Sequence, residues 1–217
     1  MKLHTVVVTF NRLELTRITI ESYLETVTVP HTLCVVDNAS SQEMRDWLLL
    51  NESDYDLVLL DENRYPGYAC NRGWERAADD ADFLQRADND FVFLPGWCEE
   101  VERHFRRPLL GQLGLRTADE ELHVRSNVGG NCIIRRVLWD GGLRYNETPW
   151  PDLPPGYSED SYFSPEVVRM GYNWARVKQP CIRSLASGDW SDPYYQRSYG
   201  DRGIGPKPHD PTVSSVE

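Results

Sequence analysis

Two carboxylates one residue apart, Asp88 and Asp90, are the side chains of this sequence best suited to holding a metal ion. They follow a short strand-like run, Phe83–Ala87, and carboxylate oxygens at this spacing can converge on one hard cation. A Mg²⁺ or Mn²⁺ ion held in this way keeps coordination positions open for the phosphate groups of a substrate. Asp and Asn are also common turn residues, so a solvated turn between two strands is the alternative reading.

Four strand-like runs have to position these carboxylates. Each is rich in apolar, often β-branched residues, which is typical of strands covered on both faces in a parallel sheet. The runs are Leu3–Phe10, Thr32–Asp37, Asp56–Leu60 and Phe83–Ala87. Helical spacing of apolar residues follows the first run up to Val27, and Ser40 or Ser41 is a suitable N-cap for a second helix through Leu50. This alternation predicts a mainly parallel α/β sheet that binds ligands beyond the carboxyl ends of its strands.

Polar residues follow every one of these runs. They are Thr9–Asn11, Asp37–Asn38, Asn63 and Asp88–Asp90, and all of them are expected at that one sheet edge. The segment Arg64–Gly73 is interpreted as a loop leading into Trp74–Ala78. Its Gly67 and Gly73 would let the backbone approach a ligand, and Asn71 offers an amide donor and acceptor; simple turn glycines are the alternative.

The pattern changes beyond Pro95–Trp97. We expect a helix over 97–106, strands over 109–116 and 128–135, a short helix from Val137 stopped by Gly141–Gly142, and an irregular segment over 145–156. A helix is expected from Ser158 to Gly171, with Glu159 and Asp160 in its first turn, where the helix dipole favours negative charge. A last strand is expected over 172–181, and residues 200–217 are interpreted as a flexible tail.

Composition narrows the functional classes. The chain has 217 residues, which suits one domain, and its net charge of −11 argues against a nucleic-acid partner, which would need clustered cations. Its five cysteines form no CxxC pair, so buried free thiols are expected. The start is too polar for a signal peptide and no apolar run could span a membrane, which predicts a cytoplasmic protein without a transmembrane segment.

Taken in order, these landmarks resemble the family 2 glycosyltransferases of the GT-A fold. The matching segments are 6–12, 35–40, 62–63, 66–68, 71–73, Asp88–Asp90, 95–97, 130–136, Glu159–Asp160 and 169–172. The resemblance implies a single GT-A-type α/β domain over 1–199, with a Rossmann-like, mostly parallel sheet flanked by helices. Residues 1–97 would form the nucleotide-sugar-binding half, and residues 98–199 a smaller mixed half that binds the acceptor.

The same resemblance implies roles for single residues on the donor side. Thr9, Asn11 and Arg12 would line the nucleoside pocket, and Asp37 would accept a hydrogen bond from the base, which suits uracil and a UDP-linked sugar. Gly67, Tyr68 and Asn71 would pack against the nucleoside. Asp90 would ligate Mn²⁺ or Mg²⁺ directly, and Asp88 would contact the ribose or the metal.

On the acceptor side, Asp160 matches the catalytic base of the family, with Glu159 beside it. A carboxylate there could take the proton of a glycan or other acceptor hydroxyl as it attacks the anomeric carbon, and one-step attack would invert that centre. Ordinary helix-end acids are the alternative reading. The aromatic residues before the base are expected to form an acceptor wall or to pack in the core. They are Trp139, Tyr145, Trp150 and Tyr157.

Some positions depart from the family pattern. Many relatives carry a metal-binding His after the last strand, whereas 182–188 contains none; Asp189 or water could take its place, and His209 is a poor substitute in the tail. Arg86 is interpreted as an exposed strand position, with an orientation toward the diphosphate as the alternative. Residues 189–199 could form a lid or a surface strap. Without membrane helices, the chain is expected to transfer single sugars to a soluble or surface-presented acceptor.

Two other functions stay open. A sugar-nucleotide pyrophosphorylase shares the opening architecture but would want a Gly-rich basic loop after the first strand, and 9–12 contains no Gly. A non-catalytic nucleotide- or carbohydrate-binding module of the same fold is the other alternative. Retention of both carboxylate pairs favours an enzyme over such a module.

Overall fold

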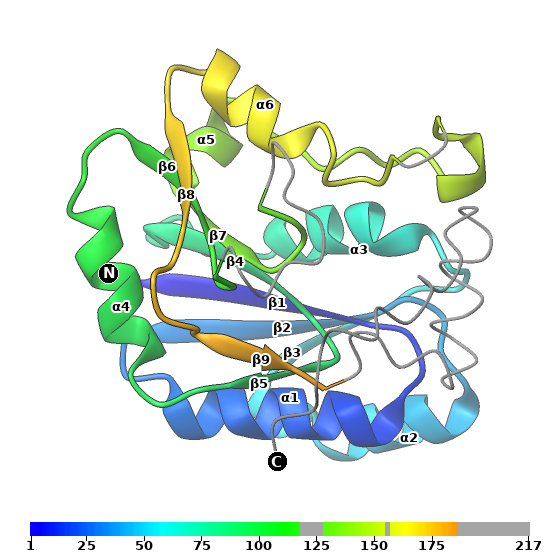
Figure 1. The fold of residues 1–217 in the computed structure, drawn as a ribbon. Helices are drawn as coiled ribbons and strands as arrows, with labels where there is room; N and C mark the ends of the chain where they lie inside the picture. Colours follow the sequence, from blue (N-terminus) through cyan, green and yellow to red (C-terminus); the bar gives the residue numbers. More distant parts are fainter. Residues whose placement is uncertain (118–127, 155–156, 186–217) are drawn as a thin grey trace, which may run out of the picture.

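The computed structural model describes residues 1–117, 128–154 and 157–185 of the chain (Figure 1). Strands and helices alternate in the first half of the described chain. Its strands are β1 (Leu3–Thr9), β2 (His31–Asp37), β3 (Asp56–Leu59), β4 (Phe83–Asp88) and β5 (Phe91–Phe93). Its helices are α1 (Leu13–Thr26), α2 (Gln42–Leu50), the 3-10 turn η1 (Glu52–Asp54), α3 (Tyr65–Trp74) and α4 (Trp97–Phe105).

The second half is less regular. It contains β6 (Leu110–Gly114), β7 (Cys132–Arg135), α5 (Arg136–Asp140), the 3-10 turn η2 (Trp150–Asp152), α6 (Phe163–Arg169), β8 (Asn173–Arg176) and β9 (Ile182–Ser184). The predictions for residues 189–199, for Asp189 and for the tail 200–217 concern residues that the structure does not describe.

Within the described residues, seven strands form one mixed sheet in the order β3-β2-β1-β4-β7-β6-β8. In this sheet β3, β2, β1 and β4 pair in parallel, β7 pairs antiparallel with β4 and β6, and β6 pairs in parallel with β8. β5 and β9 form a separate antiparallel pair. The predicted α/β fold, with a parallel sheet and a smaller mixed part, is therefore confirmed.

Helices cover both faces of the sheet (Figure 1). Alternate strand residues point to opposite faces, so Leu3 and Val7 of β1 join the core against α1, α2 and α4, whereas Val6 and Val8 join the core against α3, α5 and α6. On β4 the same alternation sends Gln85 to the α1 face and Arg86 to the α3 face. All five cysteines are buried and free, as predicted.

A row of hydroxyl groups on α1 fixes the strand that follows the Asp-x-Asp motif. Thr19 Oγ1 accepts a hydrogen bond from the backbone N–H of Phe91 at 3.2 Å, and Ser22 Oγ accepts one from Phe93 at 3.0 Å. These hydroxyls face inward at helical spacing and satisfy backbone groups that would otherwise be buried without partners. The segment after β4 is thereby held against α1.

Three expected elements differ in the structure. Residues 65–74 form the helix α3 rather than a loop, because Pro66 suits a first helical turn and the two glycines allow close packing. A Cβ on Gly73 would lie 2.5 Å from a methyl of Val6, so this glycine seats α3 on the sheet. Of the strand expected over 172–181, only Asn173–Arg176 is strand, as β8, and the next strand, β9, begins at Ile182 in the other sheet.

The helix expected from Ser158 begins later, at Phe163, so Glu159 and Asp160 lie in the turn before α6 and not in its first turn. Pro165 explains the difference: it has no N–H to donate, so it is tolerated in the first turn but would break a helix that began at 158. The two acids therefore stand on irregular backbone beside the sheet.

No helix in the described part of the chain is long and apolar enough to cross a membrane.

A buried histidine predicts how the stability of the fold depends on pH. His4 bonds the carbonyl of Gly73 at 3.0 Å and the hydroxyl of Thr32 at 2.7 Å, and burial lowers its pKa from the usual 6.5. Between 6.5 and that lower pKa the unfolded chain binds more protons, so the free energy of unfolding should fall as the pH is lowered through this window. Urea unfolding at pH 7.5, 6.5 and 5.5 measures the effect.

His4→Gln should flatten this pH dependence, by about 1.4 kcal/mol per pH unit at most. The exposed His31, replaced in His31→Gln, is the matched control and should leave the dependence unchanged. Parallel pH profiles for wild type and His4→Gln would contradict the assignment.

Candidate active site

The loops at the carboxyl edge of the parallel strands contain strained backbone. Among the described residues, the non-glycine residues with positive φ are Asn11, Arg12, Ala39 and Tyr65, with φ between 55° and 65°. They follow β1, β2 and β3, on the edge where β4 delivers the Asp-x-Asp motif. Such strain tends to persist where function requires a fixed backbone shape, so this edge is the candidate site.

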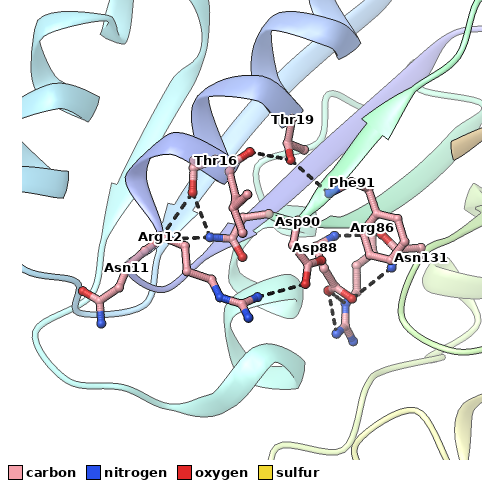
Figure 2. Close-up of polar contacts among 11 residues, drawn as sticks. Asn11, Arg12, Thr16, Thr19, Arg86, Asp88, Asp90, Phe91 and Asn131 are labelled. Carbon is pink, nitrogen blue, oxygen red and sulfur yellow. Dashed lines mark hydrogen bonds and ion pairs between the residues drawn. The ribbon is translucent and has the colours of Figure 1, made fainter. Parts of the chain in front are cut away.

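The three residues of the motif point in different directions. Asn89 turns away from the edge and donates from Nδ2 to the carbonyl of Asn11 at 3.1 Å and to the hydroxyl of Thr16 at 2.8 Å. Asp88 and Asp90 point the other way, each toward an arginine (Figure 2). The central Asn therefore anchors the motif to α1 and to the loop after β1.

Asp88 is held on three sides. Arg86 donates to its Oδ1 from Nε at 3.1 Å and from Nη2 at 2.9 Å, and Asn131 Nδ2 donates to Oδ2 at 3.0 Å (Figure 2). The backbone N–H of Asp88 also donates to Asn131 Oδ1 at 2.9 Å. The carboxylate is one-third exposed, so it is oriented by its partners and still accessible.

Asp90 is paired with Arg12, whose Nη1 donates to Oδ2 at 2.9 Å (Figure 2). Burial raises the pKa of the Asp90 carboxyl to about 6, and the negative charge of Asp88 adds to the rise, while Arg12 opposes it. Asp90 thus carries a negative charge that its surroundings only partly compensate. A cation bound here would relieve that cost.

Glu159 and Asp160 differ sharply in environment. Glu159 is buried, and its Oε1 lies 2.8 Å from Arg86 Nη2, while its Oε2 accepts a hydrogen bond from Trp150 Nε1 at 2.6 Å. Asp160 is partly exposed and accepts a hydrogen bond from the hydroxyl of Ser158. Of the two carboxylates, Asp160 is the more accessible to a substrate.

The expected exposure of Arg86 is wrong. Its side chain is buried, with the guanidinium carbon 4.8 Å from the centre of the Tyr145 ring. Burial alone would lower the pKa of this guanidinium, but Asp88 and Glu159 beside it raise the pKa well above the usual value. It therefore stays charged in the interior.

At the end of β2, Asp37 is fully buried and its carboxylate is hydrogen-bonded to the loops around it. Its carboxylate accepts hydrogen bonds from Thr9 Oγ1 at 3.2 Å, from the Ser40 N–H at 3.1 Å and from Arg45 Nε at 3.1 Å. Asn11 joins the same loops, since its N–H donates to Ser40 Oγ at 2.8 Å and its Oδ1 accepts from Ser41. Thr9, Asn11 and Asp37 are thus brought together, as predicted for this edge.

The remaining candidates lie on α3. Gly67 packs so closely that a Cβ would approach the carbonyl of Asn146 and the side chain of Glu159. The amide of Asn71 is buried, accepting from the Tyr145 N–H at 3.1 Å and donating to the Tyr145 carbonyl at 3.0 Å. Tyr68 is partly exposed, with the guanidinium groups of Arg64 and Arg72 4.7 and 4.8 Å from its ring centre. Gly67 and Asn71 therefore join α3 to the half that carries Glu159.

The aromatic residues expected at an acceptor wall divide into two groups. Trp139 and Tyr145 are buried in the core against α3, whereas Trp150 is partly exposed and packs against Tyr65. Tyr157 is exposed and stacks on Tyr162. Of the four predicted residues, only Trp150 and Tyr157 are therefore exposed enough to contact an acceptor.

The donor set at the edge fits a hard divalent cation. Asp88 and Asp90 offer carboxylate oxygens, and Mg²⁺ is commonly held by one or two carboxylates with substrate phosphates completing its shell. Within the described residues, no group of three or more His, Cys, Asp and Glu could hold a metal ion. The backbone N–H of Leu185 donates to the Asp90 carbonyl at 2.8 Å, so the chain after β9 runs beside this pair.

Sequence reasoning gave no role in the site to Gly130 or Asn131. A Cβ on Gly130 would lie 2.6 Å from Arg86 Nη2, so only a glycine fits beside that guanidinium. The one available signal was Arg86, a charged residue inside the predicted strand, whose partner Glu159 lies far away in sequence.

Solved structures with the same fold include glycosyltransferases. Staphylococcus aureus TarS 1–349 matches with a TM-score of 0.65 and 14% identity, over 88% of this chain and 62% of that chain. The mannosyltransferase PcManGT from Pyrobaculum calidifontis, solved with GDP-Man and Mn²⁺, matches with a TM-score of 0.62 and 19% identity, over 82% of this chain and 54% of that chain. TarS 1–349 in complex with UDP-GlcNAc matches with a TM-score of 0.60 and 16% identity, over 86% and 61%.

This chain therefore spans less than two thirds of the length of these structures. No curated protein sequence matches it. The profile of the family described as glycosyl transferase family 2 matches residues 5–138, which is more than half of the chain and includes the Asp-x-Asp motif. The chain belongs to glycosyl transferase family 2, and it has the GT-A fold of these structures.

Proposed function

We propose that this enzyme transfers a sugar from a nucleoside diphosphate donor, UDP-linked in our reading, to an acceptor hydroxyl, with a divalent cation at Asp88 and Asp90. The observation that carries the proposal is the carboxylate pair at the carboxyl edge of the parallel sheet, where Asp90 has a raised pKa of about 6. Because its surroundings disfavour the charged form of Asp90, a bound cation would stabilise this carboxylate. The same cation could bind the diphosphate of the donor.

The chain supplies three functions around the donor. The loops after β1 and β2, held by Asn11 and Asp37, form the nucleoside end, and the strained backbone at Asn11 and Arg12 fixes their shape. Arg12 lies beside Asp90 and supplies positive charge next to the diphosphate position. When bound, the divalent ion stabilises negative charge on the departing diphosphate.

Asp160 is the proposed general base. It is the partly exposed member of its pair, and it would accept the proton of the acceptor hydroxyl as the hydroxyl oxygen bonds to the anomeric carbon and the diphosphate leaves. Attack on the face opposite the leaving group inverts the anomeric centre. Trp150 and Tyr157, near this turn, are the proposed acceptor contacts.

Donor binding is tested by calorimetric titration with UDP and GDP, each with and without Mn²⁺. We expect UDP to bind in the presence of Mn²⁺ and Asp90→Asn to weaken this binding at least about 10-fold, because it removes a direct metal ligand. Asp79→Asn is the matched control, since Asp79 is fully exposed and lies near Arg136, outside the candidate site. Failure of both nucleotides to bind the wild type would refute the donor proposal and favour a non-catalytic module, and preference for GDP would refute the uracil assignment.

The base is tested by comparing Asp160→Asn with Glu159→Gln in a UDP-release assay over a panel of acceptors. Asp160→Asn should lower kcat about 10²- to 10⁴-fold while UDP affinity and thermal stability stay near wild type, since a base acts only on the reacting proton. Glu159→Gln should instead destabilise the protein by about 3 kcal/mol, because Arg86 loses a buried partner. Wild-type turnover in Asp160→Asn would exclude Asp160 as the base.

A further inference from the structure

Arg86 lies between the two carboxylate pairs of the site. Its Nη2 lies 2.9 Å from Asp88 Oδ1 and 2.8 Å from Glu159 Oε1, so one guanidinium contacts both segments. Asp88 ends β4, and Glu159 precedes Asp160 in the turn before α6. No other described residue is recorded in an ion pair with both of these carboxylates.

Stability alone does not account for this arrangement. Taking a guanidinium and a carboxylate out of water costs several kcal/mol per ion, and apolar residues of similar volume often give equal or greater stability. Arg86 Nη1 is moreover buried without a hydrogen-bond partner among the described residues. An interior charge with an unsatisfied donor calls for a reason other than packing.

The surroundings of Arg86 restrict its position closely. The Tyr145 ring centre lies 4.8 Å from the guanidinium carbon, and a Cβ on Gly130 would lie 2.6 Å from Arg86 Nη2. Asn131 donates to the Asp88 carboxylate that Arg86 also contacts (Figure 2). Arginine is suited to this task because its planar fork fixes direction as well as charge, whereas lysine offers a mobile point charge. The guanidinium is therefore held where it orients both carboxylates together.

We propose that Arg86 is a positioning residue that couples the donor-side carboxylate Asp88 to the turn carrying Glu159 and Asp160. This inference rests on the proposed function for its catalytic consequence. Because both segments share one guanidinium, the metal-side carboxylate and the proposed base keep a fixed relative position across the gap that the donor and acceptor would occupy. Arg86 itself touches neither substrate.

The coupling is tested first by unfolding, which needs no substrate. Asp88→Asn, Glu159→Gln and the double variant are compared by urea titration. When one carboxylate is removed, Arg86 keeps the other, but the double variant leaves the guanidinium without either. The decrease in the free energy of unfolding should therefore be larger in the double variant than the sum of the decreases in the single variants. Additive decreases would overturn the proposed coupling.

The positioning role is tested with Arg86→Lys, and with the double variant Arg86→Met/Glu159→Gln, which removes both buried charges if the lysine variant does not fold. Both variants should lower the affinity for UDP–Mn²⁺ and, separately, kcat, each at least about 10-fold. The reason is that Arg86 no longer holds Asp88 and the turn carrying Asp160 in position. Arg136→Lys is the matched control, because Arg136 is a largely buried arginine paired with Asp140 away from the site. Wild-type affinity and turnover in a folded Arg86 variant would show a merely structural role and overturn the proposal.

Failure of the proposed function and failure of the inference about Arg86 give different experimental results. If the wild-type chain binds no nucleotide, the proposed function fails irrespective of Arg86, and the unfolding comparison still decides whether Arg86 couples the two segments. If the wild type binds UDP and the Arg86 variants behave like Arg136→Lys, only the inference about Arg86 fails.

Discussion

The parallel register of β3, β2, β1 and β4 is the constraint on which the site depends. Thr9 pairs with Asp37, Val8 with Asp88 and Asp37 with Leu59, so these strands end along one line. Parallel strands place all of their carboxyl ends on the same edge, and residues far apart in sequence meet there without any further device. A one-residue slip of β4 would turn Arg86 and Asp88 to the α1 face and separate them from Glu159. The register of the strands therefore determines the geometry of the site.

Charge compensation completes the arrangement. The site carries Asp88, Asp90, Glu159 and Asp160, and two largely buried arginines, Arg12 and Arg86, offset part of this negative charge. The arginines come from different elements and act on different carboxylates (Figure 2). Arg86 serves Asp88 and Glu159 and leaves Asp160 accessible, while Asp90 remains under-compensated next to Arg12. On the proposed function, Asp90 would bind the cation and Asp160 would accept the proton of the acceptor hydroxyl.

Much of the fold could be predicted from the sequence, because the patterns that indicate it involve residues close together in the chain. The strand runs, the polar ends and the parallel sheet were predictable because burial on both faces requires continuous apolar residues. Arg86 was misjudged because its partners Glu159 and Tyr145 are separated from it by more than fifty residues, and only the fold brings them near. Segment 65–74 was read as a loop since Pro66, Gly67 and Gly73 are turn residues in isolation, yet each has a packing reason in α3. Likewise, the hydroxyl groups on α1 are polar and so escape a search for apolar periodicity. Their role became clear only from their hydrogen bonds to the backbone N–H groups of Phe91 and Phe93.

The central claim is that a nucleoside diphosphate and its metal bind at this edge. Diffraction from crystals grown with UDP and Mn²⁺, recorded at the manganese absorption edge, tests it most directly. We predict an anomalous peak within coordination distance of Asp90, shared with the diphosphate oxygens, and the uridine against the loops after β1 and β2. Density for UDP or manganese elsewhere on the molecule, with this edge empty, would contradict the account.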